Sequence, residues 1–190
     1  MKLSDLICCY NGLNHEDCNR IIDWFKKNSH LHQEGRASAT GNGSVVKWDH
    51  KVATQAYPEK NDEISHFITS KIINAFQKYE SEYPSPKGEP LGLRDLSVRV
   101  YPKEKGFFLE HFDQNALNVH RVFAIIIYLN DVEVGGSTTF PDLDVSIKPE
   151  EGKILIFPCN YLFSHEGEMP ISNEKYIVTA FINFQDISRH

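Results

Sequence analysis

From Leu96 onward the chain consists of short segments rich in β-branched and aromatic residues, separated by glycine and proline. Within each segment the side chains alternate with a period of two, which is the period of a β-strand. Closely spaced short strands with such turn residues favour a β-sandwich or barrel over alternating strand–helix units. The expected strands are residues 97–101, 107–113, 122–129, 137–140, 153–157, 161–165 and 175–184.

The first part of the chain has a helical period instead. Asn14 followed by acidic residues is typical of a helix start, and apolar side chains then recur at helical spacing toward Lys27. A second apolar stripe predicts a helix over residues 62–79, which two prolines soon afterwards prevent from continuing. Residues 35–44 are rich in glycine, serine, threonine and asparagine, so we expect a long loop there.

Residues 122–129 are apolar on both faces, which indicates a central strand covered on both sides. The two helices are the obvious cover for its outer face. We therefore predict a mainly β, α+β fold: a double-stranded β-helix, that is, a jelly-roll or cupin-like barrel, backed by N-terminal helices. Residues 1–190 are expected to form a single domain, with a helical support region at 1–90 and a barrel core at 91–190.

Composition limits the classes of partner. The 190 residues are 41% hydrophobic and 24% charged, as in an ordinary globular domain. A net charge of −6 argues against nucleic acid as a partner, because phosphate binding needs a basic face. No apolar run approaches the roughly 18 residues that a membrane helix needs, so no membrane partner is expected. Three of the four cysteines crowd the first eighteen residues, which predicts reduced thiols and a cytoplasmic location.

The strongest functional signal is His111 followed two residues later by Asp113, with His165 fifty-two residues further on. Residues i and i+2 of a strand point to the same side, so the first pair can bind one metal ion. Two imidazoles and one carboxylate form the facial triad of non-haem Fe(II) oxygenases, which leaves coordination positions open. The similar pair His15 and Asp17 opens a helix, where the two side chains diverge, and is not expected to bind metal.

Three further residues are expected around this triad. Lys175 begins the last long strand on the same side as apolar residues, and a lysine inside a barrel is costly unless it meets an anion. Tyr101 and Tyr128 lie on strand faces that are also expected to point inward. One ammonium and two phenols together suit a dicarboxylate cosubstrate. Taken singly, each also fits an ordinary role, as a surface lysine or a half-buried strand aromatic.

These and other motifs follow one order along the chain: Tyr101-Pro with Gly106, His111-x-Asp113, Arg121, Tyr128-Leu-Asn, Gly135-Gly-Ser-Thr-Thr-Phe-Pro, His165 and Lys175. In this order they resemble the prolyl 4-hydroxylase-like branch of the 2-oxoglutarate/Fe(II)-dependent dioxygenase superfamily. Residues 131–143 are especially similar to collagen-type prolyl 4-hydroxylases, and residues 101–130 to the oxygen-sensing prolyl hydroxylases. The resemblance covers residues 95–185 and, more weakly, residues 10–28.

The resemblance implies roles for individual residues. His111, Asp113 and His165 match the iron ligands of the family. Lys175 matches the basic residue that pairs with the distal carboxylate of 2-oxoglutarate, and Tyr128 matches a hydrogen-bond partner of the same group. Fe(II) and 2-oxoglutarate are thus the implied cofactor and cosubstrate, with ascorbate as a candidate reductant.

Two further matches and two departures concern the walls of the site. Tyr101 matches a tyrosine that lines the cosubstrate pocket, and Arg121 matches an arginine that faces the substrate in some members. Ala124 stands where many relatives have a threonine, which removes one polar contact to the cosubstrate. Lys175 stands where many relatives have an arginine; either cation serves, but lysine pairs as a point charge rather than as a fork.

The resemblance implies an enzyme that couples decarboxylation of 2-oxoglutarate to succinate and CO2 with hydroxylation, using O2. The expected target is proline within a flexible protein or peptide segment, over which the loop at 35–44 is expected to close. Other readings stay open: another protein side chain, a free amino acid, or a barrel that binds metal without catalysis. A structural zinc site would lack its fourth protein ligand.

Overall fold

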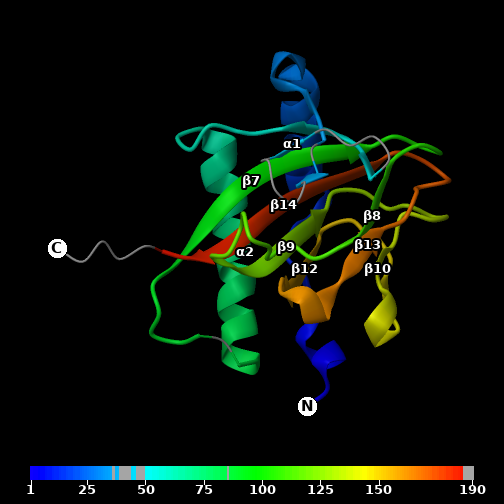
Figure 1. Ribbon diagram of the computed structural model, residues 1–190. Coiled ribbons are helices and arrows are strands. Elements are labelled where there is room, and N and C mark those ends of the chain that lie inside the picture. The colour runs from blue at the N-terminus through cyan, green and yellow to red at the C-terminus, as the bar shows by residue number, and fades with distance from the viewer. Residues whose placement is uncertain (36, 39–43, 46–49, 85, 186–190) are drawn as a thin grey trace.

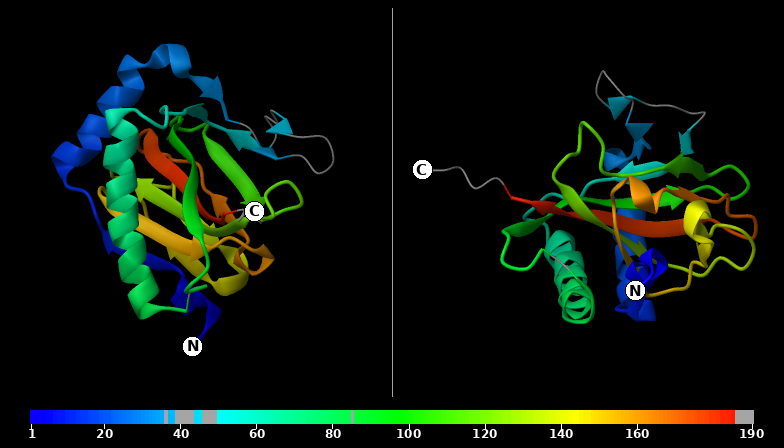
Figure 2. Two further views of the ribbon diagram at one scale, coloured as in Figure 1. Left: turned by 90° about the vertical axis from the view of Figure 1, so that its left-hand side faces the viewer. Right: turned by 60° about the horizontal axis from the view of Figure 1, so that its bottom comes forward.

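Two antiparallel β-sheets face each other, and two long helices lie against the outer face of the larger sheet (Figure 1, Figure 2). This computed structural model describes residues 1–35, 37–38, 44–45, 50–84 and 86–185. The long helices are α1 (His15–Lys27) and α2 (Glu63–Glu82). Short 3-10 turns occur at Leu3–Leu6, Ser29–Leu31, Pro141–Leu143 and Tyr161–Phe163.

The larger sheet has the strand order β1-β12-β9-β14-β7-β6-β2. Its strands are β1 (Cys8–Asn11), β2 (Gln33–Glu34), β6 (Thr54–Ala56), β7 (Leu91–Tyr101), β9 (Arg121–Tyr128), β12 (Lys153–Pro158) and β14 (Lys175–Phe184).

The smaller sheet has the order β11-β10-β13-β8-β5. Its strands are β5 (Lys51–Val52), β8 (Phe107–His111), β10 (Thr138–Phe140), β11 (Val145–Ile147) and β13 (His165–Gly167). All pairings in both sheets are antiparallel. The predicted fold class, a mainly β jelly-roll backed by N-terminal helices, is confirmed.

The central strand β9 buries both of its faces, as its sequence predicts. Phe123, Ile125 and Ile127 pack toward the helices, whereas Ala124 and Tyr128 lie in the cluster between the two sheets. Alternate residues of one strand therefore belong to two different cores, because successive side chains of a strand point to opposite faces.

The helices begin and pack as the sequence predicts. The Asp17 N–H donates to Asn14 Oδ1 over 2.9 Å, and the Asn14 N–H donates to Asp17 Oδ2 over 3.3 Å, so the two residues form a capping box. Helix α2 ends at Glu82, three residues beyond the predicted end. The apolar stripes of both helices are buried against the larger sheet: Cys18, Ile21, Phe25, Ile64, Ile68, Ile72, Ala75, Phe76 and Tyr79.

One predicted strand is wrong. Residues 161–165 do not form a continuous strand, since Tyr161–Phe163 is a 3-10 turn and strand β13 begins only at His165. The reason is a local cap: Asn160 Oδ1 accepts a hydrogen bond from the Leu162 N–H over 3.0 Å. A side chain that bonds to nearby backbone in this way competes with strand pairing and favours a turn.

The first 90 residues contribute strands as well as helices. Strands β1, β2 and β6 belong to the larger sheet and β5 to the smaller one, so this part of the chain widens both sheets. Within the predicted loop at 35–44, Ala37–Ser38 (β3) pairs with Ser44–Val45 (β4), and residues 36 and 39–43 lie outside the described residues. No helix of the described residues has the length and apolar character needed to cross a bilayer.

Candidate metal centre

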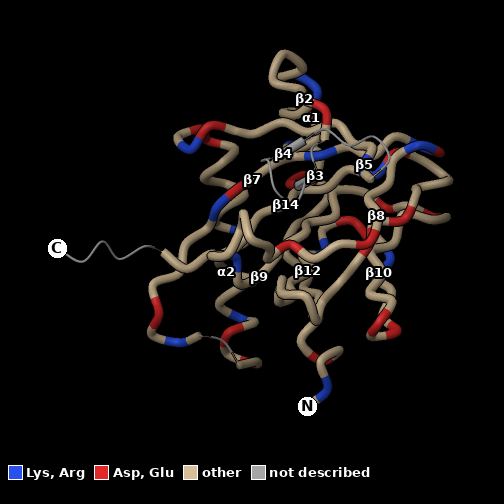
Figure 3. The backbone as a smooth tube through the Cα atoms, viewed as in Figure 1, with Lys and Arg blue, Asp and Glu red and all other residues tan. Residues whose placement is uncertain are grey.

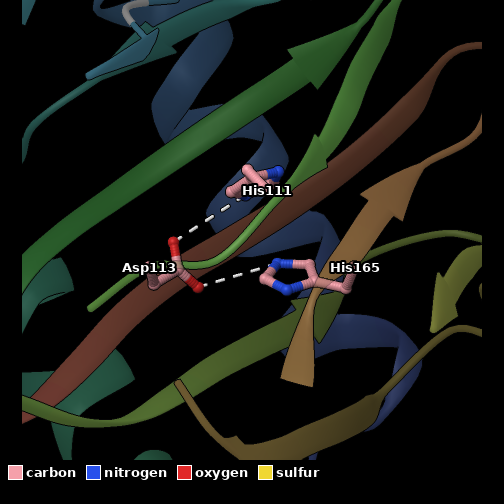
Figure 4. Close-up of side chains that lie close together, drawn as sticks. All are labelled: His111, Asp113 and His165. Carbon is pink, nitrogen blue, oxygen red and sulfur yellow. Dashed lines mark ion pairs between the residues drawn. The ribbon is translucent and has the colours of Figure 1, made fainter. Parts of the chain in front are cut away.

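The three side chains predicted to bind metal lie together at one end of the smaller sheet (Figure 4). His111 ends β8 and His165 begins β13, and the two are direct partners across these paired strands. Asp113 lies two residues beyond the end of β8 rather than on it. Its Oδ1 is 3.8 Å from His111 Nε2, and its Oδ2 is 3.6 Å from His165 Nε2. One potential ligand atom from each residue lies within 4.8 Å of the others.

Backbone carbonyls fix the orientation of both imidazoles. His111 Nδ1 lies 2.7 Å from the Leu109 carbonyl oxygen, and His165 Nδ1 lies 3.1 Å from the Phe163 carbonyl oxygen. An N–H at Nδ1 donates to each carbonyl, which leaves the lone pair on Nε2 to face the carboxylate. Metal-binding histidines characteristically have their second nitrogen held in this way.

The electrostatics of the site favour the protonation states that a metal requires. Burial, together with the neighbouring His165, lowers the pKa of His111 to about 3. Burial by itself raises the pKa of Asp113, but the two histidines and two nearby arginines hold it below its usual value. At neutral pH the His111 imidazole is therefore neutral and the carboxylate ionised, which is the state in which these groups bind metals.

A narrow pocket of about 40 Å³ leads from the triad into the space between the sheets. Lys175 lies in it with only 3% of its surface exposed. Its Nζ donates to the Gly136 carbonyl oxygen over 2.6 Å and lies 5.7 Å and 5.5 Å from the ring centres of Tyr101 and Tyr128. Burial lowers the pKa of Lys175 to about 7, while Glu168 acts in the opposite direction.

Strand register explains why these three residues meet. Lys175 of β14 is paired with Tyr101 of β7, and Ile177, two residues further on, is paired with Tyr128 of β9. The Tyr128 hydroxyl donates to Thr138 Oγ1 over 2.8 Å, so β10 of the smaller sheet also contributes. Thr138 belongs to the motif that begins at Gly135, but its bond to Tyr128 depends on contact between the two sheets and could not be predicted from the motif.

Comparison with known proteins agrees with this geometry. Residues 96–183 match the family described as the 2OG-Fe(II) oxygenase superfamily. This part of the chain is a 2OG-Fe(II) oxygenase domain. Fe(II) and 2-oxoglutarate are the cofactor and cosubstrate of that superfamily. Two imidazoles with one carboxylate suit Fe(II), and a buried ammonium suits a dicarboxylate.

Two curated proteins are similar in sequence. The chain is 32% identical over 97 residues to a probable prolyl 4-hydroxylase 11 of Arabidopsis thaliana, which covers 46% of this chain and 32% of that protein. It is 22% identical over 210 residues to 5-methylcytosine-modifying enzyme 1 of Chlamydomonas reinhardtii, which covers 98% of this chain and 38% of that protein. The chain thus spans about a third of the length of these relatives.

Solved structures with the same fold include prolyl hydroxylases. A viral collagen prolyl hydroxylase from Paramecium bursaria Chlorella virus-1, solved with 2-oxoglutarate, matches with a TM-score of 0.69 and 20% identity, over 95% of this chain and 97% of that chain. A Trichoplax adhaerens prolyl hydroxylase, solved with a peptide fragment of hypoxia inducible factor, matches with a TM-score of 0.74 and 18% identity, over 95% and 84%.

A second, larger cavity of about 460 Å³ also borders the triad, and residues before the matched segment help to line it. Arg121, predicted to face the substrate, lines this cavity together with His111 and Asp113. Its guanidinium lies 3.6 Å from the centre of the Phe181 ring, and its Nη2 forms an ion pair with Asp95 at 2.7 Å.

Asp95 is a residue that sequence reasoning missed. Its φ of 55° is in the left-handed region, and the register between β14 and β7 shifts beside it. Such a bulge re-aims a side chain, and here it brings the Asp95 carboxylate to Arg121. A positive φ at aspartate is tolerated more readily than at most residues, but the sequence carries no turn motif that marks it.

The pair expected not to bind metal lies elsewhere. His15 begins α1 and its Nδ1 lies 3.0 Å from Glu151 Oε1, while Asp17 pairs with Lys71 at 2.6 Å. Neither residue lines the two cavities beside the triad.

Proposed function

We propose that this chain is a 2-oxoglutarate- and Fe(II)-dependent hydroxylase whose target is proline within a flexible peptide segment. The observation that carries the proposal is the position of one buried cation, Lys175, in a narrow pocket that opens onto a His-Asp-His cluster. A buried ammonium with a carbonyl as its hydrogen-bond partner still has donors for an anion. The two features together suit a metal and a chelating dicarboxylate.

In this proposal His111, Asp113 and His165 hold the metal. Lys175 binds the distal carboxylate of 2-oxoglutarate, with Tyr128 and Tyr101 beside it. When bound, Fe(II) supplies the activation of O2 that couples decarboxylation of 2-oxoglutarate to hydroxylation of a C–H bond, and ascorbate serves as a reductant.

The contribution of the chain itself is orientation and exclusion of water. The Leu109 and Phe163 carbonyls hold the two imidazoles in one tautomer, so their Nε2 atoms stay directed toward the metal position. Phe140 and Phe157 pack around His165, with ring centres 5.5 Å and 4.8 Å from it. These aromatic rings keep that side of the site dry, as radical-type oxidation requires.

The larger cavity supports a peptide as the target. Its volume of about 460 Å³ lies in the range of pockets that enclose ligands well above the size of one amino acid. Tyr57, Leu109 and Phe112 line it and stay 43%, 45% and 41% exposed, so the cavity offers apolar surface to a peptide. An extended proline-containing segment loses little entropy when such a surface captures it.

Nucleic acid is the less favoured target, although one relative is named as a 5-methylcytosine-modifying enzyme. The net charge is −6, and blue and red segments are interspersed along the described chain in Figure 3. Binding to a phosphate backbone instead requires a continuous basic face.

Turnover against a panel tests the proposal. Purified protein with Fe(II), 2-oxoglutarate and ascorbate is offered proline-containing peptides, the same peptides with alanine for proline, free amino acids and a 5-methylcytosine oligonucleotide. We expect succinate release and a mass gain of one oxygen for proline peptides alone. Hydroxylation of a free amino acid, or of an alanine-substituted peptide, with no proline peptide turned over, would contradict the choice of substrate.

A further inference from the structure

The larger cavity is lined by both basic and acidic side chains, and the acidic ones are Asp95, Glu110 and Asp113. Lys51, Arg99 and Arg121 all line this cavity together with the candidate metal ligands His111 and Asp113. Lys51 is only 2% exposed and its Nζ lies 4.7 Å from the centre of the Phe108 ring. Burial lowers the pKa of Lys51 well below its usual value, so the two arginines are the lasting positive charges of this cavity.

Arg99 stands at the junction of the two cavities, since it lines both of them. Its Nε donates to Ser97 Oγ over 3.0 Å, and Ser97 Oγ in turn lies 2.9 Å from Thr179 Oγ1. The guanidinium also lies beside the Tyr101 hydroxyl. These contacts fix the orientation of the fork but occupy few of its five N–H donors.

Arg99 differs from the other arginine of the cavity in its counter-charge. Arg121 forms an ion pair with Asp95 at 2.7 Å. Arg99 has no carboxylate within 4.0 Å among the residues that the structure describes. Asp113 lies close enough to be affected by the charge of Arg99 but does not pair with it directly. A ligand carboxylate can therefore still form a direct ion pair with the Arg99 guanidinium.

A second polar group without a partner lies directly opposite Arg99. Gln55 of β6 is its strand partner on β7, is only 1% exposed and also lines the cavity. The Gln55 amide nitrogen donates to the Tyr57 hydroxyl over 2.9 Å, but its Oε1 has no hydrogen-bond partner in the described part of the chain. Buried acceptors of this kind are rare in native proteins and are satisfied when a donor arrives.

We propose that Arg99 and Gln55 form a subsite for an amino-acid unit of the substrate that carries a free carboxylate. The carboxylate pairs with the Arg99 guanidinium, and a neighbouring N–H donates to Gln55 Oε1. This inference rests on the proposed hydroxylase function. It requires that the substrate carry a carboxylate close to the carbon that is hydroxylated. The carboxylate has three sources: an acidic side chain beside the proline, the C-terminus of a peptide, or a free amino acid.

Matched pairs of compounds separate these sources. The first pair is a peptide with Pro-Glu against the same peptide with Pro-Gln, both with an amidated C-terminus. The second is a peptide that ends after proline as a carboxylate against its amide, and the third is free proline against prolinamide. We expect the acidic member of at least one pair to have a kcat/KM higher by about tenfold or more, the usual effect of a charge-assisted hydrogen bond.

Variants assign this preference to Arg99. In Arg99→Gln the preference for the acidic member should disappear, and in Arg99→Lys part of it should remain. Gln55→Glu places a carboxylate next to Arg99 and should also remove the preference. Arg20→Gln is the matched control, because Arg20 lies on α1 and pairs with Glu63 away from both cavities. The ratio within one pair does not depend on the fraction of folded enzyme.

Several outcomes would overturn the subsite. One is an equal kcat/KM for both members of all three pairs. Another is a rise in the KM for 2-oxoglutarate in Arg99→Gln while the preference for the acidic member is retained. That result would mean that Arg99 binds the cosubstrate rather than the substrate. A third is turnover of a 5-methylcytosine oligonucleotide that depends on Arg99, because phosphates would then be the anion.

A binding measurement tests the subsite independently of whether proline is the residue that is hydroxylated. Peptide pairs with alanine in place of proline are titrated into protein loaded with Fe(II) and 2-oxoglutarate under exclusion of O2. Tighter binding of the acidic member, lost in Arg99→Gln, supports the subsite even if no proline compound is hydroxylated. Equal binding of both members contradicts the subsite even if proline is hydroxylated.

Discussion

The two faces of the larger sheet are built from the same strands but carry different kinds of side chain. The face toward the helices is almost entirely apolar, with Ile127 and Val178 fully buried there. The face toward the smaller sheet buries Lys175, Ser97 and Thr179 among apolar residues. Buried polar groups cost stability unless they have partners, so their presence on one face alone separates the side that binds from the side that only packs.

Removing a metal ligand should have the largest effect on turnover. His165→Ala takes one of the three candidate ligands from the inner side, and we expect it to abolish metal-dependent 2-oxoglutarate turnover. Succinate release with and without added Fe(II) measures this. His15→Ala is the control and should keep wild-type turnover, because His15 lies on α1. If His165→Ala retains full turnover, the three residues do not form the metal site.

A truncation on the helix-facing side should act on stability instead. Ile127→Ala removes three buried methyl and methylene carbons from a fully buried side chain, and such changes cost about 2–5 kcal/mol. Denaturant unfolding should show this loss, while the KM for 2-oxoglutarate of the folded protein stays the same. A large change in that KM would mean that the two faces are not independent.

Removing the inner cation should act on the cosubstrate. Lys175→Ala deletes a charge-assisted bond worth about 1.5–3 kcal/mol, so 2-oxoglutarate should bind roughly ten- to a hundredfold more weakly. Titration of 2-oxoglutarate into the Fe(II)-loaded protein measures this, and Lys175→Arg should recover part of the affinity. Unchanged affinity in Lys175→Ala would exclude its role in cosubstrate binding.

The smallest expected effect is a pH dependence. The pKa of Lys175 is lowered from 10.5 to about 7 by burial, so above pH 7 the free protein increasingly loses this proton. The anion binds the protonated form, so 2-oxoglutarate binding should take up a proton, and its affinity should fall as the pH rises above 7. The effect on the free energy of unfolding has the opposite sign. Between pH 7 and 10.5 Lys175 keeps its proton in the unfolded chain but loses it in the folded protein, so the free energy of unfolding rises with pH.

Calorimetry in two buffers of different ionisation enthalpy measures the proton uptake at pH 8. Lys175→Arg keeps its charge throughout this range, so its affinity should not vary with pH. A wild-type affinity that is flat from pH 6.5 to 9 would contradict the assignment.

Those parts of the fold that depend on local pattern could be predicted from the sequence. The apolar run at 122–129 predicts a strand buried on both faces, and the Asn14 cap predicts the start of α1; both are found. The turn at Tyr161–Phe163 was missed, because one hydrogen bond from Asn160 decides between a turn and a strand. Strands β5 and β6 are two and three residues long, too short for any periodicity to show.

The same division holds for the site. The alternation of side chains along strands, together with the resemblance to a known family, brought His111, Asp113, His165 and Lys175 under consideration together. Arg99 and Gln55 belong to no local motif, and only the pairing of β6 with β7 brings them side by side. Groups that act through pairing between strands distant in sequence cannot be inferred from one chain until its register is known.

The pairing of His111 with His165 has a consequence for the mechanics of the fold. The two residues are more than fifty positions apart in the chain, yet they are direct partners where β8 meets β13. A metal ion bound by both histidines would act as a reversible cross-link between β8 and β13 and would close the segment of chain between them. It would make the smaller sheet the part of the molecule whose order depends on the supply of metal, whereas the helix-backed sheet stands on its own packing.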